Sequence, residues 1–129
     1  MGRAMHVLII EDDFLTALLL AEILGDLGFD SSAFAATEQE AIAAAGRQCP
    51  DLITADVRLQ AGNGIAAVRK ICAGKVIPVI YVTASRHQLT HLTEAIIVEK
   101  PFTDFAVKTA VAAVRRTHPG IAMDSPRGQ

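Results

Sequence analysis

The chain has 129 residues, a length that suits one domain and is sufficient to bury a real core. Hydrophobic residues make up 51% of the chain and charged residues 20%, a globular composition that excludes a disordered protein. The net charge of −2 implies nothing about nucleic acid, but the chain has no basic stripe, so we expect no nucleic-acid partner, and no segment is long and apolar enough to span a membrane.

The cysteine content and the N-terminus both favour a cytoplasmic protein. Cys49 and Cys72 have neither the spacing of a metal site nor the density of a secreted disulfide scaffold, so we expect reduced thiols. The N-terminal segment does not resemble a signal peptide, because its apolar stretch is broken at once by Glu11, Asp12 and Asp13.

The first third of the chain predicts a strand, a helix and a second strand. His6–Ile10 is an apolar run of β-forming residues, as expected of a buried strand. Leucine and isoleucine then recur at helical spacing over Leu15–Leu24, and Gly28 is suited to close that helix. Ser31–Phe34 is a weaker strand candidate.

The middle of the chain continues the alternation. Thr37–Glu40 matches a capping box, which predicts a helix through roughly Gln48. Leu52–Ala55 follows a proline and an aspartate and is typical of a third strand. The turn Gly62-Asn63-Gly64 then leads into a helix through about Ala73.

The last third contains two more predicted strands and a final helix. Pro78–Val82 is apolar throughout, the polar stretch Ser85–Glu94 has no clear periodicity, and Ala95–Val98 predicts a fifth strand. Thr103 is placed to cap a helix that runs to about Arg116.

Alternating strands and helices predict parallel pairing with right-handed crossovers. The strands are continuous apolar runs, as expected when both faces of a sheet are covered. We therefore expect an α/β fold, a doubly wound five-stranded parallel sheet with helices on both faces, over residues 1–116, and a flexible C-terminal tail over 117–129.

Reactive side chains stand where four of the predicted strands end. Glu11, Asp12 and Asp13 follow the first strand, Asp56 the third, Thr83 the fourth and Lys100 the fifth. In such sheets ligands bind at the carboxyl ends of the strands. Clustered carboxylates repel one another, and Mg²⁺ with its oxygen ligands relieves that repulsion. Together with a hydroxyl and an ammonium group, they supply the groups needed for phosphoryl transfer to an aspartate.

The chain resembles the receiver domain of bacterial response regulators from His6 to about Arg116. Each matching motif is weak by itself, but their order along the chain, each at a strand end, is specific. The motifs are Glu11-Asp12, Asp56 after Asp51–Ala55, Asn63-Gly64, Thr83-Ala84 and Lys100-Pro101-Phe102.

The resemblance implies a role for each matching residue. Asp56 would be the phosphoacceptor, Thr83 and Lys100 would bind the phosphoryl oxygens, and the Lys100–Pro101 bond would be cis. Mg²⁺ would be held by Glu11, Asp12, Asp56 and the backbone carbonyl of Arg58. Asp13 is expected to cap the first helix instead, and Arg58 and Ser85 flank the site where they can tune the lifetime of the phosphate.

Two departures from the family affect how a signal leaves the domain. Ile97 stands three residues before Lys100, where receivers usually have tyrosine or phenylalanine, so an aromatic rotamer switch cannot operate in its usual form. The interval from Thr83 to Lys100 is also short, which predicts a fourth helix that is short or missing. Both changes fall on the face that receivers commonly use for output.

The implied function is a phosphoacceptor receiver in a two-component system, which signals through protein contacts. Its partners would be a sensor histidine kinase or a histidine phosphotransfer protein, an unknown downstream protein and, in one option, a second copy. It would not be an enzyme beyond slow self-dephosphorylation. Two alternatives remain: a degenerate receiver that only binds partners, and an aspartate-nucleophile phosphatase, although Arg58 stands where such phosphatases need a second aspartate.

Overall fold

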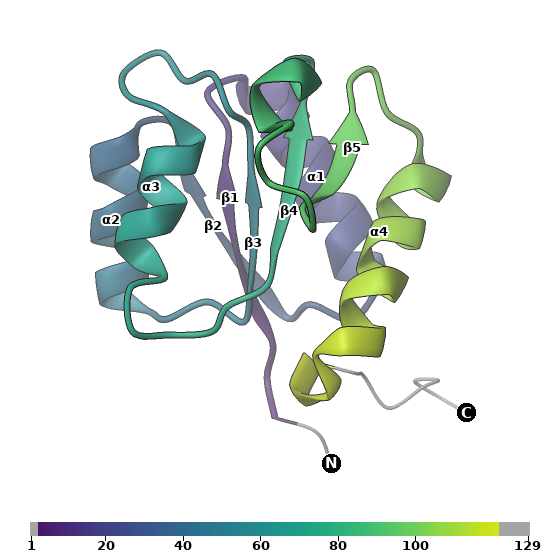
Figure 1. The fold of residues 1–129 in the computed structure, drawn as a ribbon. Helices are drawn as coiled ribbons and strands as arrows, with labels where there is room; N and C mark the ends of the chain where they lie inside the picture. Colours follow the sequence, from purple (N-terminus) through teal and green to yellow (C-terminus); the bar gives the residue numbers. More distant parts are fainter. Residues whose placement is uncertain (1–2, 122–129) are drawn as a thin grey trace.

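Five parallel strands form the centre of the structure, a computed structural model that describes residues 3–121 (Figure 1). The strands are β1 (His6–Ile10), β2 (Ser31–Ala35), β3 (Leu52–Ala55), β4 (Val79–Thr83) and β5 (Ile96–Glu99). Their order in the sheet is β2-β1-β3-β4-β5, and all neighbouring pairs are parallel. The predicted fold class is confirmed, with β4 and β5 beginning one residue later than the sequence indicated.

Helices cover both faces of this sheet. The α-helices are α1 (Phe14–Asp26), α2 (Glu38–Arg47), α3 (Gly64–Ile71) and α4 (Asp104–Thr117), with 3₁₀ turns at η1 (Arg86–Leu89) and η2 (Pro119–Ile121). Figure 1 shows α2 and α3 on one face and α1 and α4 on the other. Two apolar clusters result: α1 and α4 pack with one side of the strands, and α2 and α3 with the other.

The N-termini of α2 and α4 are fixed by threonine caps, as the sequence predicts. Thr37 accepts a hydrogen bond from the Glu40 N–H at 3.0 Å, and Thr103 accepts one from Ala106 at 3.1 Å. Glu40 completes the box by accepting from the N–H of Ala36, one residue earlier than in the usual pattern. These bonds fix the start of each helix close to the carboxyl ends of the strands.

The predicted short or missing fourth helix is confirmed. Only η1 stands between β4 and β5, a single 3₁₀ turn in which Leu89 is 1% exposed and packs with the cluster under α2 and α3. The segment has few apolar residues, and an amphipathic helix needs three or four of them over two turns to bury a face.

The packed chain extends beyond the predicted end of the domain at residue 116. α4 ends at Thr117, η2 follows, and Ile121 is 5% exposed within the core beside α4. Residues 117–121 of the predicted tail are the end of α4, its C-cap and η2, and residues 122–129 lie outside the described residues. Over residues 3–121, no helix combines the length and the apolar character that a membrane crossing needs.

Candidate functional site

Three carboxylates meet at the carboxyl ends of β1 and β3, which are neighbours in the sheet. Glu11 follows β1 and Asp56 follows β3, and both residues are buried, whereas Asp12 is exposed. One oxygen from each of the three carboxylates lies within 4.8 Å of the others. The sequence predicted this convergence, because parallel strands place their carboxyl ends at one edge.

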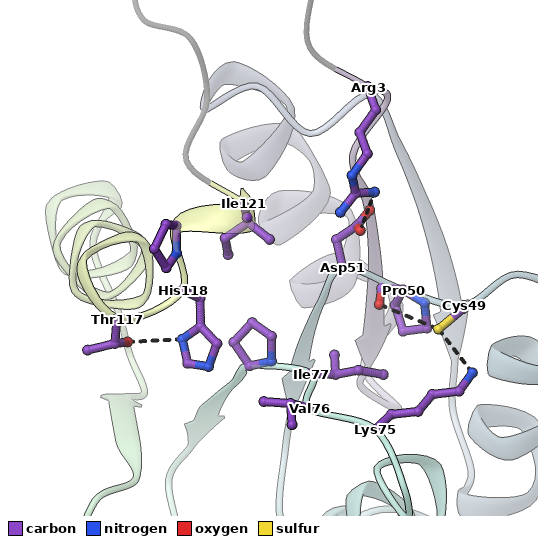
Figure 2. A pocket seen from close by; sticks show the side chains of 13 residues that line it. Arg3, Cys49, Pro50, Asp51, Lys75, Val76, Ile77, Thr117, His118 and Ile121 are labelled. Carbon is purple, nitrogen blue, oxygen red and sulfur yellow. Dashed lines mark hydrogen bonds and ion pairs between the residues drawn. The ribbon is translucent and has the colours of Figure 1, made fainter.

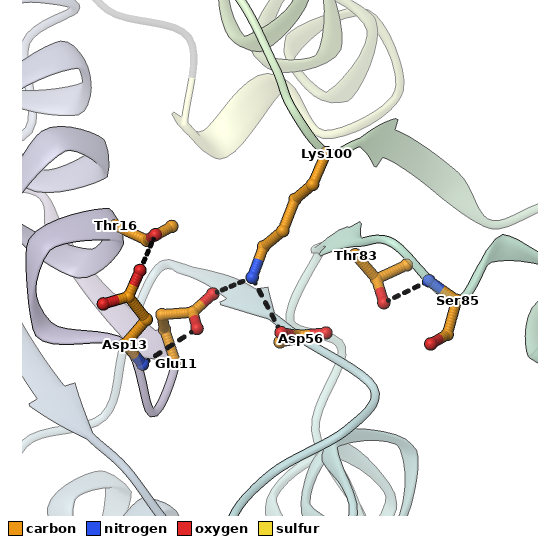
Figure 3. A network of polar contacts seen from close by, with 7 residues as sticks. All are labelled: Glu11, Asp13, Thr16, Asp56, Thr83, Ser85 and Lys100. Carbon is orange, nitrogen blue, oxygen red and sulfur yellow. Dashed lines mark hydrogen bonds and ion pairs between the residues drawn. The ribbon is translucent and has the colours of Figure 1, made fainter.

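Lys100 reaches between two of these carboxylates from the end of β5 (Figure 3). Its Nζ lies 2.7 Å from Glu11 Oε1 and 2.8 Å from Asp56 Oδ2. The peptide bond that follows it, Lys100–Pro101, is cis, as the resemblance implied. One ammonium thus bridges the two buried members of the acidic cluster.

Burial and ion pairing shift the pKa values of Glu11 and Lys100 in opposite directions. Burial raises the pKa of Glu11, and the hydrogen bond from Lys100 offsets only part of that effect. Burial would lower the pKa of Lys100, but its bonds to Asp56 and Glu11 outweigh this and raise the pKa above its ordinary value. The ammonium therefore stays charged at neutral pH.

The donor set fits a small hard cation. Three carboxylates face one ammonium, so the cluster keeps excess negative charge, and the exposed Asp12 places it at the protein surface. Carboxylate oxygens are the ligands that Mg²⁺ prefers, and Mg²⁺ commonly binds through one or two carboxylates while keeping several waters. Glu11, Asp12 and Asp56 therefore satisfy the chemical requirement for a Mg²⁺ site.

Thr83 ends β4, the strand next to β3, and is fully buried. Its Oγ1 accepts a hydrogen bond from the N–H of Ser85 at 3.0 Å. A hydroxyl has one proton to donate as well as lone pairs to accept. Thr83 therefore keeps a donor for an oxygen placed near Asp56, and Figure 3 shows Thr83 on the opposite side of Asp56 from Glu11.

The loop that leaves Asp56 is closed by a short backbone bridge. Arg58 pairs with Asn63, and the N–H of Gly64 donates to the Val57 carbonyl at 2.8 Å. Gly64 also lies so close to Asp56 that an added Cβ would stand 1.8 Å from the Asp56 carbonyl oxygen. The side chain of Asn63 caps α3 by accepting from two backbone N–H groups. The sequence identified Asn63-Gly64 only as a turn, although Asn before an apolar helix is a recognised cap signal.

Asp13 differs in detail from the prediction. It does occupy the N-cap position of α1, but its carboxylate accepts from the Thr16 hydroxyl, and no side-chain bond to a backbone N–H caps the helix. The Thr16 bond is the main reason that the pKa of Asp13 lies below its usual value. Its own N–H donates to Glu11 Oε2 at 3.0 Å, so the backbone of Asp13 orients a carboxylate of the site.

Ile97 lies in the middle of β5 and pairs with Tyr81 of β4 in the sheet. Its side chain is partly buried against the cluster under α2 and α3, which includes Leu89 of η1. The two departures from the family pattern, Ile97 and the short interval, are thus in the same region of the molecule.

A cavity of about 460 Å³ lies at the opposite edge of the sheet (Figure 2). Its lining includes residues that precede β3 and β4, together with η2. Arg3 and Asp51 form an ion pair across 2.7 Å at its rim, and the Thr117 hydroxyl lies 2.9 Å from His118 Nδ1. It is separate from the acidic cluster, because it lies at the amino ends of the strands.

Comparison with known proteins gives a consistent result. The family model described as response regulator receiver domain matches residues 7–112. The solution structure of the receiver domain of PhyR from Erythrobacter litoralis is similar, with a TM-score of 0.81, 31% identity, and coverage of 98% of this chain and 96% of that one.

Two curated relatives are much longer than the matching region. Transcriptional regulatory protein PdtaR of Mycobacterium tuberculosis is 36% identical over 79 residues, which are 61% of this chain and 38% of the relative. A protein-glutamate methylesterase/protein-glutamine glutaminase of Haloarcula marismortui is 30% identical over 109 residues, 84% of this chain and 29% of the relative. The chain therefore spans well under half the length of these curated relatives.

Proposed function

The chain belongs to the response regulator receiver domain family, and from this membership we propose that Asp56 accepts a phosphoryl group in a Mg²⁺-dependent reaction. The donor is a phosphohistidine on a sensor histidine kinase or a histidine phosphotransfer protein. The observation that carries the proposal is the position of Lys100 Nζ, 2.8 Å from Asp56 and 2.7 Å from Glu11, within a cluster of three carboxylates. A buried carboxylate flanked by an ammonium and further oxygen ligands is suited to act as a nucleophile toward phosphorus.

The chain's own residues each perform a defined part of the transfer. An oxygen of Asp56 attacks the phosphorus in line, and the bond from phosphorus to the donor's nitrogen breaks as the new O–P bond forms. Lys100 pairs with a phosphoryl oxygen, and Thr83 donates its free proton to another. Glu11, Asp12 and Asp56, together with the Arg58 carbonyl, would hold Mg²⁺, which would supply charge neutralisation at the phosphoryl oxygens.

Exposed apolar side chains on α1 and α4, the two helices that begin beside the acidic cluster, are suited to contact the donor protein. Phe14, Leu15 and Leu18 on α1 are 63%, 74% and 42% exposed, and Phe105 on α4 is 76% exposed. Both helices begin where a strand ends at the site, α1 after β1 and α4 after β5. Exposed apolar patches of this kind mark protein contact surfaces. We infer that the helix carrying the donor histidine packs here, which places the histidine over Asp56.

The output is a change in protein contacts in the cytoplasm. Phosphorylation adds negative charge and acceptor oxygens next to Thr83. When Thr83 moves toward these oxygens, it shifts the backbone of Ser85, whose N–H donates to the Thr83 hydroxyl. Ser85 directly precedes η1, so the position of η1 changes as well. Slow loss of the phosphate from Asp56 is the only catalytic turnover in this proposal, and the downstream partner is a protein.

The test is intact mass spectrometry after incubation with Mg²⁺ and acetyl phosphate. We expect the gain of one phosphoryl group, which disappears when EDTA replaces Mg²⁺ and when Asp56 is changed to Asn. Asp104→Asn makes the same chemical change at an exposed aspartate of α4 and should leave the gain intact.

Other outcomes would change the function assigned. An equal gain in Asp56→Asn would show that another residue is the acceptor. No gain in the wild type with either acetyl phosphate or a phosphorylated kinase would favour a receiver that only binds partners. Repeated turnover of a generic aryl phosphate would instead favour an aspartate-nucleophile phosphatase.

A further inference from the structure

Glu38, the first residue of α2, contacts the loop that follows the strand of Asp56. Its backbone N–H donates to the carbonyl of Ala61 at 3.1 Å, and its carboxylate Oε1 accepts from the N–H of Asn63 at 3.2 Å. A parallel bridge between Thr37 and Ala61 adjoins these bonds. The N-terminus of α2 therefore holds the far end of the β3–α3 loop, residues 56–63, by backbone and side chain together.

Lys70 of α3 fixes the orientation of the Glu38 carboxylate. Its Nζ lies 2.6 Å from Glu38 Oε2, and the side chains of Lys70 and Glu38 are 59% and 21% exposed. An exposed ion pair contributes little to stability by itself. The ion pair instead fixes the orientation of the Glu38 carboxylate: Lys70 occupies Oε2, and Oε1 stays directed at the Asn63 N–H.

The fit between Glu38 and the loop is close. A Cβ at Gly62 would lie 2.5 Å from the Cβ of Glu38 and 2.7 Å from its Oε1. Gly62 also has φ of +92°, a backbone conformation that side chains other than glycine rarely adopt. The loop can reach Glu38 only because this position is glycine.

The position of Asn63 affects the backbone of two residues at the acidic site, Asp56 and Arg58. Asn63 lies opposite Arg58 in an antiparallel bridge across the loop, which constrains the backbone of both residues. The next residue, Gly64, is bonded to Val57 and lies against the carbonyl of Asp56. A shift of Asn63 therefore moves both the phosphoacceptor's own backbone and the carbonyl of Arg58.

We propose that Glu38 is a positioning residue for the Mg²⁺ site. Through its contact with Asn63, Glu38 holds the Arg58 carbonyl and Asp56 in place. This inference rests on the proposed function, in which Asp56 and the Arg58 carbonyl are metal ligands. Groups that orient ligands without touching the metal commonly change metal affinity strongly when they are removed.

The experiment measures the Mg²⁺ dissociation constant by titration calorimetry, and the Mg²⁺ dependence of phosphorylation by acetyl phosphate. Glu38→Ala removes the acceptor for Asn63, and we expect it to weaken Mg²⁺ binding by about 10-fold. At saturating Mg²⁺ the phosphorylation rate should return to that of the wild type, since Glu38 touches neither Asp56 nor Lys100. Glu38→Gln retains one oxygen, for which Lys70 and the Asn63 N–H compete, so its Mg²⁺ affinity should lie between those of the wild type and Glu38→Ala.

Gly62→Ala tests the same contact between Glu38 and the β3–α3 loop by a change in the loop. The new Cβ would displace Glu38, so this variant should show the same loss of Mg²⁺ affinity as Glu38→Ala. Unfolding in EDTA identifies any variant that is not folded. Mg²⁺ affinity in Glu38→Ala equal to that of the wild type would overturn the inference, and so would an equal loss in Glu38→Gln. A wild type that binds no Mg²⁺ would overturn the proposed function itself, which is a distinguishable result.

Discussion

Removal of the Asp12 charge is expected to have opposite effects with and without Mg²⁺. The Asp12 carboxylate has two carboxylate neighbours, Glu11 and Asp56, at 4.8 Å or less. Each such pair repels by about 0.9 kcal/mol in a water-like dielectric and by about 3.5 kcal/mol at an effective dielectric of 20. Because Asp12 is exposed, the lower value applies, and the Lys100 ammonium that pairs with both neighbours cancels part of the repulsion. Asp12→Asn should therefore stabilise the metal-free protein by about 1 kcal/mol or less.

The assay is urea unfolding of wild type and Asp12→Asn, in EDTA and at saturating Mg²⁺. The gain in EDTA should shrink with added salt, which screens exposed charges. In Mg²⁺ the order should reverse, because a ligand that binds only the folded state adds stability that grows with the logarithm of its concentration divided by its dissociation constant, and Asp12→Asn removes one of the metal's ligands. Glu22→Gln changes the same charge on the exposed side of α1 and serves as control. A loss of stability in EDTA for Asp12→Asn, or a gain equal to that of Glu22→Gln, would refute the electrostatic argument.

Three further changes test the fold around the site. Gly64→Ala should cost about 2 kcal/mol or more in urea unfolding, because the new Cβ would overlap the Asp56 carbonyl oxygen at 1.8 Å. Thr54→Val should stabilise by about 1 kcal/mol in the same assay, because the buried Thr54 hydroxyl has no hydrogen-bond partner among the described residues. The hydrogen bond from Lys70 is the main reason that the pKa of Glu38 is lowered, so the stability it gives is present above the ordinary value of 4.5 and is lost as pH falls through the lower folded pKa. Unfolding measured against pH should therefore decline less steeply below 4.5 in Glu38→Gln than in the wild type.

The sheet and the acidic cluster were predictable because their signals are local and the rules of parallel sheets are general. Each strand is a short apolar run, and a doubly wound sheet places the residue after each strand at one edge. Glu11, Asp56 and Lys100 are far apart in the sequence, yet the rule brings them together, and the structure places the Lys100 ammonium between the two carboxylates. Thr83 likewise takes its position from the strand that it ends.

Several contacts that support the site have no such signal. Glu38 contacts Asn63 across 25 residues, and nothing in a capping box shows that its second residue also binds a distant loop. The carboxylate of Asp13 bonds to a neighbouring hydroxyl in place of a backbone N–H, a choice made by side-chain rotamers. Ile121 follows a proline and a glycine, which predicts a frayed end, and only the hydrophobic pocket beside α4 explains its burial.

Because only a single 3₁₀ turn lies between β4 and β5, this segment can rearrange at a free-energy cost that is separate from the cost of unfolding the whole protein. Leu89 is the one apolar side chain of residues 84–95 that is fully buried, so the segment is attached to the core at few points. Segments of this kind open with free energies far below that of global unfolding. Amide hydrogen exchange should therefore be faster here than in β1 or β3. A substitution at Thr90 or His91 should alter that local exchange while the denaturation midpoint of the protein stays the same.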